Sequence, residues 1–193
     1  MHEYDLIADW YANDRSRSIG VREALESLAT LPRGARVLDL GCGNGVPLTA
    51  ALVDAGYSVV GLDSSNAMLA RFHRNLADTA VVRADARQCP FKPGTFDAAV
   101  SWGMMFHMTR AEQSLALANL THVLKPGAPF HFTAAEIPTV ADPDPGITGT
   151  MNGVTFHYYA VASYKELLAA HGFELIETFD DPGANSYFVA RKS

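Results

Sequence analysis

Cysteine is scarce in this sequence, with Cys42 and Cys89 the two cysteines among 193 residues. Two thiols are too few for the disulfide framework of a small secreted protein, and their spacing matches no metal-binding pattern. The sequence therefore predicts a chain that works in a reducing compartment, the cytoplasm, and it predicts no metal site.

Positive charge is scarce as well. Fifteen Lys and Arg residues face 21 Asp and Glu residues, which gives a net charge of −6 at pH 7. A protein that neutralises many phosphates needs a basic surface, because those contacts supply most of its affinity. We therefore expect no nucleic acid among the partners.

Long hydrophobic runs are missing too. The longest stretch without a charged side chain, residues 145–164, is rich in Gly, Thr and Tyr, whereas a membrane helix needs about 20 mostly apolar residues. The first five residues carry two acids and lack the apolar core of a secretory leader. We expect neither a membrane segment nor a leader.

What the sequence does contain is a regular alternation of apolar runs and helical patterns. Its length suits one domain, and 48% hydrophobic residues suffice for a sizeable core. The last two apolar runs are joined by only six residues, too few for a parallel crossover, so they form an antiparallel hairpin. The pattern predicts a doubly wound α/β sheet, a core over 34–193 and short N-terminal helices over 1–33. Strands are expected at 36–40, 58–62, 80–83, 96–101, 130–134, 173–179 and 186–190. Helices are expected at 46–55, after Ser64 or Ser65, from a capping box of Thr109 and Glu112 to Leu124, and from a capping box of Ser163 and Glu166 to His171.

A glycine turn at residues 41–45 lies between the first predicted strand and its helix. The glycines allow a sharp turn and a close approach to a ligand, and the helix start offers unpaired N–H groups. The next strand ends on Asp63, whose two oxygens can accept hydrogen bonds from a ribose diol. The segment therefore predicts a nucleotide-like ligand at this edge of the sheet.

The residues after the turn distinguish between two cofactor classes. A dinucleotide-binding turn needs a third small residue three positions after Gly43, where this chain has Val46 and then Pro47. The segment 37–45 instead resembles motif I of the class I S-adenosylmethionine-dependent methyltransferases, small-molecule type, and the resemblance extends over nearly the whole chain from Gly34. It implies a Rossmann-like sheet of seven strands with the last antiparallel, S-adenosylmethionine as cofactor and S-adenosylhomocysteine as product.

The resemblance also implies a role for individual residues. The glycine turn would lie under the methionine part of the cofactor, Asp39 near its ammonium group, and Asp63 on the ribose. Asp85 and Ala86 would meet the adenine. The complete predicted cofactor set is Asp39, Gly41, Cys42, Gly43, Asp63, Ser64, Met68, Asp85, Ala86 and Trp102.

Three of these residues have a plain structural alternative. Asp63 could cap the following helix, a role that Ser64 could fill equally well. Met68 could be ordinary core packing instead of a cover for the adenine face. Trp102 could line the sulfonium, form a wall for the substrate, or belong to the core.

His107 is the candidate catalytic residue. It follows the fourth predicted strand, and a neutral imidazole with an ordinary pKa of about 6.5 can take a proton from a nucleophile. The alternative is a histidine at a helix start that is bonded to the backbone. Candidate substrate residues are Glu136 after the fifth strand, His157 after a Pro- and Gly-rich stretch over 138–153 that could be a substrate loop, and Tyr11 on an N-terminal helix that would act as a lid.

The sequence thus predicts an enzyme that transfers a methyl group to a small-molecule acceptor. The nucleophilic atom of the acceptor and the oligomeric state stay open. Two other functions also stay open: an NAD-type oxidoreductase, which Val46 and Pro47 disfavour, and a binding module that holds the cofactor without catalysis.

Overall fold

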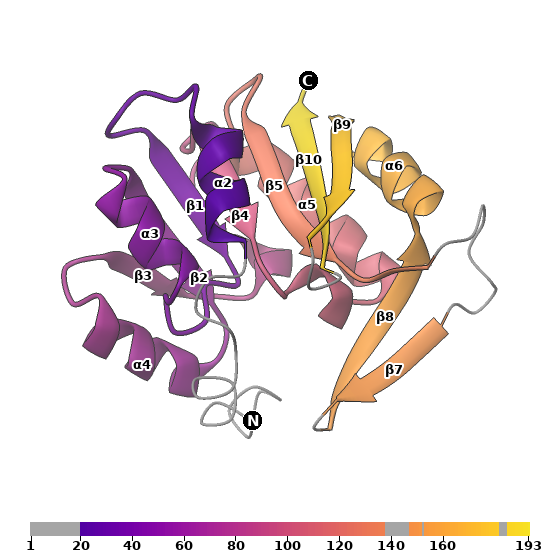
Figure 1. The fold of residues 1–193 in the computed structure, drawn as a ribbon, viewed down its shortest axis with the longest axis horizontal. Helices are drawn as coiled ribbons and strands as arrows, with labels where there is room; N and C mark the ends of the chain where they lie inside the picture. The colour runs from indigo at the N-terminus through magenta and orange to yellow at the C-terminus, as the bar shows by residue number, and fades with distance from the viewer. Residues whose placement is uncertain (1–19, 138–146, 152, 182–184) are drawn as a thin grey trace.

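The computed structural model describes residues 20–137, 147–151, 153–181 and 185–193 of the chain. Seven strands form one sheet in the order β3-β2-β1-β4-β5-β10-β9 (Figure 1). β1 to β5 run parallel to one another, and β10 is antiparallel to both β5 and β9. The predicted doubly wound sheet with an antiparallel last strand is therefore confirmed. Its strands are β1 (Arg36–Leu40), β2 (Ser58–Asp63), β3 (Ala80–Arg83), β4 (Ala98–Ser101), β5 (Pro129–Ala134), β9 (Phe173–Asp180) and β10 (Ser186–Lys192).

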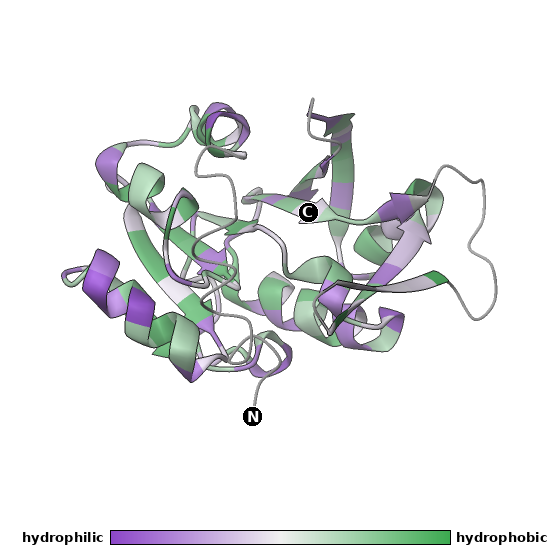
Figure 2. Cartoon of the chain, turned by 60° about the horizontal axis from the view of Figure 1, so that its bottom comes forward, coloured by the Kyte–Doolittle hydropathy of each residue, from purple (hydrophilic) through white to green (hydrophobic). Residues whose placement is uncertain are grey.

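Alternating side chains of the central strands are buried on both faces of this sheet. Val37 belongs to a cluster under α2 (Val21–Leu28) and α3 (Leu48–Asp54), whereas Leu38 belongs to the cluster under α5 (Arg110–Val123) and α6 (Val161–Ala170). Hydrophobic residues run along the central strands, while the helices also carry hydrophilic residues (Figure 2). Burial on both faces explains why these strands are short continuous apolar runs in the sequence.

The helix α2 is part of this core. Ala24 and Leu28 have no exposed surface, and the Tyr57 hydroxyl donates a hydrogen bond to the Leu28 carbonyl at 2.9 Å. Within the predicted lid over 1–33, α2 thus packs as a core element. The expected lid helix with Tyr11 lies outside the described residues.

The chain between β5 and α6 differs from its prediction as a long loop. Its described residues contain β6 (Glu136–Ile137), β7 (Ile147–Met151) and β8 (Val154–Ala160), which form a second sheet in the order β6-β8-β7. In Figure 1, β7 and the adjoining part of β8 extend away from the main sheet. Hereafter these three strands are called the small sheet.

Two predicted helix starts are also wrong. The first helix of the βα repeat, α3, begins at Leu48, after the glycine turn and Pro47, rather than at position 46. The helix α6 begins at Val161 after an extended Ala160 without a side-chain cap, so Ser163 and Glu166 form no capping box there. By contrast, the predicted box of Thr109 and Glu112 does cap α5.

Candidate functional site

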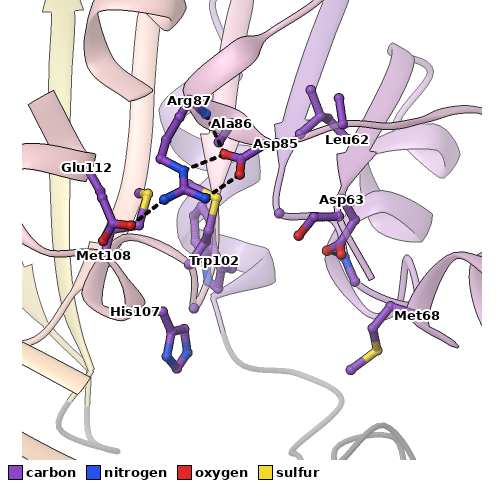
Figure 3. Close-up of a pocket in the computed structure, with 16 residues that line it drawn as sticks. Leu62, Asp63, Met68, Asp85, Ala86, Arg87, Trp102, His107, Met108 and Glu112 are labelled. Atoms are coloured by element: carbon purple, nitrogen blue, oxygen red, sulfur yellow. Dashed lines mark hydrogen bonds and ion pairs between the residues drawn. The ribbon is translucent and has the colours of Figure 1, made fainter. Parts of the chain in front are cut away.

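A cavity of ≈ 380 Å³ opens at the carboxyl ends of β1 to β4. This is the edge of a parallel sheet at which ligands bind in open α/β folds, and the volume lies within the usual range for small-molecule sites. Figure 3 shows its main side chains. The lining consists of Gly41, Gly43, Leu62, Asp63, Ser64, Met68, Ala84, Asp85, Ala86, Arg87, Trp102, Gly103, Met104, His107, Met108 and Glu112.

The glycine turn forms one wall of this cavity and is fixed by hydrogen bonds to β2. The N–H groups of Gly41 and Cys42 donate to the Leu62 carbonyl at 2.8 and 3.1 Å. Gly41 has φ = +79°, and a Cβ built there would lie 2.8 Å from the Cβ of Met104. Both conditions require glycine at position 41, so the backbone itself is exposed to the cavity.

Asp63 connects the turn to the next helix. Its Oδ2 accepts a hydrogen bond from the Gly43 N–H at 2.9 Å, and its Oδ1 accepts one from the Ser65 N–H at 2.8 Å. The N-cap of α4 (Asn66–Asn75) is Ser65, whose hydroxyl accepts from the Met68 N–H. Asp63 is therefore not the helix cap, and it lines the cavity.

Asp39 lies behind the turn and does not line the cavity. It is 2% exposed and accepts a hydrogen bond from the Thr49 hydroxyl at 2.5 Å. Burial raises the pKa of its carboxyl to about 7, and the nearby charge of Asp63 acts in the same direction. Asp39 is thus poised to ionise when a positive charge comes near.

Cys42 contributes its backbone to the turn, but its side chain packs away from the cavity. The thiol is buried with Leu69 and Phe72, and a Cβ built on Gly61 would lie 2.7 Å from its sulfur. Burial raises the pKa of this thiol well above its ordinary value. The structure therefore does not bring the Cys42 side chain to the predicted cofactor site.

Asp85 and Ala86 line the cavity as predicted, together with two residues that the prediction missed. Arg87 donates from its backbone N–H and its Nε to Asp85 Oδ1, both at 2.8 Å, and pairs through Nη1 with Glu112 (Figure 3). This ion-pair network joins the end of β3 to the start of α5, and the two carboxylates raise the pKa of the guanidinium. Glu112 was recognised from the sequence only as half of a capping box, and its second partner lies 25 residues earlier.

Methionine and tryptophan side chains supply the apolar part of the cavity. Met68 is 1% exposed and also belongs to the core, so both of its predicted roles apply. Trp102 is 8% exposed and contacts the buried rings of His131, at 4.8 Å between centroids, and Tyr187, at 5.7 Å. Trp102 thus joins the cavity to the core on the α2 side of the sheet.

His107 lies across the cavity from Asp63 and Met68 (Figure 3), at the end of the 3₁₀ turn η2 (Met105–His107). Its Nδ1 is 3.0 Å from the backbone carbonyl oxygen of Thr155 in β8. His107 is therefore bonded to the backbone, as the predicted alternative states, and it also lines the cavity.

Two of the predicted substrate residues, Glu136 and His157, do not line the cavity. Glu136 begins β6, where burial and the charge of Asp180 raise the pKa of its carboxyl. His157, in β8, stacks on Tyr159. Tyr11 lies outside the described residues. Across the described part of the chain, no group of three or more side chains is arranged to hold a metal ion, and no helix has the length and hydropathy needed to cross a membrane.

Comparisons with known proteins agree with this geometry. Residues 37–127 match the family model of a methyltransferase domain. An uncharacterized methyltransferase of Synechocystis sp. is 39% identical over 106 residues, or 55% of this chain and 49% of the relative. The demethylmenaquinone methyltransferase of Beutenbergia cavernae is 37% identical over 125 residues, or 64% of this chain and 50% of the relative. The chain thus spans about half the length of these relatives.

Two further matches show the breadth of the similarity. The tRNA (carboxymethyluridine(34)-5-O)-methyltransferase alkbh8 of Xenopus tropicalis is 33% identical over 134 residues, or 64% of this chain and 19% of the relative. The structure of SAM-bound CalS10, an amino pentose methyltransferase from Micromonospora echinaspora, aligns with a TM-score of 0.77 and 20% identity, covering 100% of this chain and 98% of that one. The two chains therefore share a fold.

Proposed function

We propose, from the premise that this chain belongs to the class I S-adenosylmethionine-dependent methyltransferases, that it transfers a methyl group from this cofactor to a small-molecule acceptor. The observation that carries the proposal is the hydrogen bond of 2.9 Å from the Gly43 N–H to Asp63. It fixes the exposed backbone turn and the ribose-accepting carboxylate as one unit at the cavity.

The residues at the cavity fit such a cofactor. Asp63 would accept the ribose hydroxyls, while Met68 and Ala86 would cover the adenine beside Asp85. Gly41 and Gly43 leave space for the methionine part. Asp39, buried behind the turn with a raised pKa, would ionise beside the ammonium group.

The bound cofactor supplies a methyl group on a positively charged sulfur, which leaves as a neutral thioether. The chain then has to hold the acceptor in line with that methyl and away from water, which contributes roughly 7–11 kcal/mol in favourable cases. No metal or elaborate acid–base machinery is required for this reaction.

His107 is the proposed base. If the acceptor is a hydroxyl or a protonated amine, replacing His107 by Gln should lower kcat by about 10²–10⁴-fold and leave the affinity for S-adenosylmethionine nearly unchanged. A variant with full kcat on such an acceptor would contradict the base role. If the acceptor is a thiolate or a neutral amine, a smaller effect through positioning is expected.

A small-molecule acceptor is favoured over RNA by charge. The chain has a net charge of −6, and Arg87, the lining residue with a permanent positive charge, is held by Asp85 and Glu112. A phosphate backbone would find little to bind at this cavity. The two free thiols, Cys42 and Cys89, suit a reducing compartment such as the cytoplasm.

The proposal is tested by following a labelled methyl group. The protein is incubated with methyl-labelled S-adenosylmethionine and a cell extract, which is then separated into metabolites, RNA and protein. We expect label in the metabolite fraction with the wild-type chain and its loss with Asp63→Ala. Label in RNA would overturn the small-molecule assignment, and cofactor binding without any transfer would favour a binding module.

A further inference from the structure

The small sheet reaches the candidate site through His107. The His107 Nδ1 lies 3.0 Å from the Thr155 carbonyl oxygen. The next residue of β8, Phe156, places its ring 4.7 Å from the imidazole, and Phe106 lies 4.7 Å from the imidazole and stacks on Phe156 at 5.2 Å. One polar and one aromatic contact thus attach the imidazole to β8, and Phe106 packs on the same ring.

The polar contact has a definite chemical consequence. A carbonyl oxygen can only accept a hydrogen bond, so Nδ1 must be the donor. In the neutral ring the single proton then lies on Nδ1 and the lone pair on Nε2. This is the form in which Nε2 can take a proton, whereas the free side chain in water favours the opposite tautomer.

We propose that the small sheet is a positioning element for His107: the Thr155 carbonyl selects the tautomer, and Phe156 holds the ring against that carbonyl. The role of the resulting Nε2 lone pair as a base rests on the proposed function. The tautomer itself does not depend on it.

The rest of the small sheet keeps β8 in place for this purpose. β7 pairs with β8 in the register Gly149↔Phe156. At the other end, the Arg110 guanidinium lies 4.4 Å from the centre of the Tyr159 ring and donates to the Ser163 carbonyl. The strand is thus attached to α5, whose start follows η2 by two residues.

Nuclear magnetic resonance tests the proposal directly. The protein is labelled with ¹⁵N at histidine, His107 is assigned with His107→Gln, and long-range ¹H–¹⁵N spectra are recorded above pH 8, where the ring is neutral. We expect the ratio of the Nδ1–H form to the Nε2–H form to be about fivefold or more higher at His107 than in the free side chain, as one net hydrogen bond would produce, and the Nδ1–H form to be the major one. A dominant Nε2–H form in the wild-type chain would overturn the proposal.

Two variants of β8 separate positioning from general damage to the sheet. Phe156→Ala should shift His107 toward the Nε2–H form, and Phe156→Leu, which keeps apolar volume, covers the case in which the alanine variant does not fold. Tyr158→Ala is the matched control, since it removes an aromatic ring from the same face of the same strand, and it should leave the tautomer unchanged. Equal tautomer shifts in the Phe156 and Tyr158 variants, or none in the folded Phe156 variants, would contradict the role of Phe156.

The experiment also keeps this proposal apart from the proposed function. A dominant Nδ1–H form with full activity of His107→Gln would retain the positioning and reject the base. A dominant Nε2–H form with an inactive His107→Gln would reject the positioning role and retain the base role.

Discussion

At the scale of single residues, Asp63 is the side chain on which cofactor binding depends most. Its carboxylate lines the cavity and accepts one N–H from the glycine turn and one from the start of α4. Replacing it would remove the ribose partner and loosen the turn at the same time.

We therefore expect Asp63→Ala to weaken S-adenosylhomocysteine binding by about 2–4 kcal/mol, or roughly 30- to 1,000-fold in Kd, since hydrogen bonds to charged groups contribute about 1.5–3 kcal/mol each. Isothermal titration calorimetry measures this change. Asp78→Ala, at an exposed acid beyond α4, is the matched control and should bind as the wild type does. Wild-type affinity in a folded Asp63→Ala protein would reject the ribose assignment.

His131 gives the folded chain a dependence on pH. It is fully buried in β5 beside Trp102, its Nδ1 is 2.8 Å from the Ser27 hydroxyl oxygen, and burial lowers its pKa to about 4. The unfolded chain takes up a proton at this histidine near pH 6.5 and the folded chain only near pH 4. The contribution of His131 to stability must therefore fall as the pH falls through this window.

The size of that loss is about 3 kcal/mol between pH 6.5 and 4. Urea unfolding at several pH values should show that His131→Gln lacks this part of the pH dependence, whereas His122→Gln, at an exposed histidine, retains it. Asp39 acts in the opposite sense, because its raised pKa makes stability fall as the pH rises toward 7. Because the wild type and His131→Gln both contain Asp39, the difference between their pH curves isolates the effect of His131. Identical pH curves for these two proteins would contradict the assignment.

At the scale of elements, α2 is a core helix, and its contribution can be measured. Leu28→Ala should lower the free energy of unfolding by about 2–5 kcal/mol, because it removes a fully buried side chain between α2 and the sheet. Glu26→Ala, on the exposed side of the same helix, should change it by less than about 0.5 kcal/mol. Equal small losses in both variants would mean that α2 is a detachable cover.

The elements also show what a sequence can and cannot predict. The strands β1 to β5, β9 and β10 are short apolar runs bounded by turns, and each was located within a few residues. The small sheet was missed because β7 and β8 follow a stretch rich in Gly, Thr and Pro and pair chiefly with each other. The ion pair of Arg87 and Glu112 was missed because a helix-capping pattern already explained Glu112, and only the fold brings these two residues together.

At the scale of the whole molecule, the order of the strands determines where chemistry can occur. β1 lies between β2 and β4, so the glycine turn, Asp63 and the residues after β4 meet at one edge. The sequence predicted this edge because residues that can bind a ligand, such as Asp63 and Asp85, directly follow the ends of the predicted strands. It did not predict which side chains turn inward, as Asp39 and Cys42 illustrate: one lies behind the glycine turn, and the other packs in the core.

The most direct test of the account is a pair of titrations of the wild-type chain, one with S-adenosylhomocysteine and one with NAD. The account predicts saturable binding of S-adenosylhomocysteine, at one molecule per chain, and no detectable binding of NAD, since Val46 and Pro47 follow the glycine turn where a dinucleotide-binding turn needs a small residue. Saturable binding of NAD together with no binding of S-adenosylhomocysteine would contradict it.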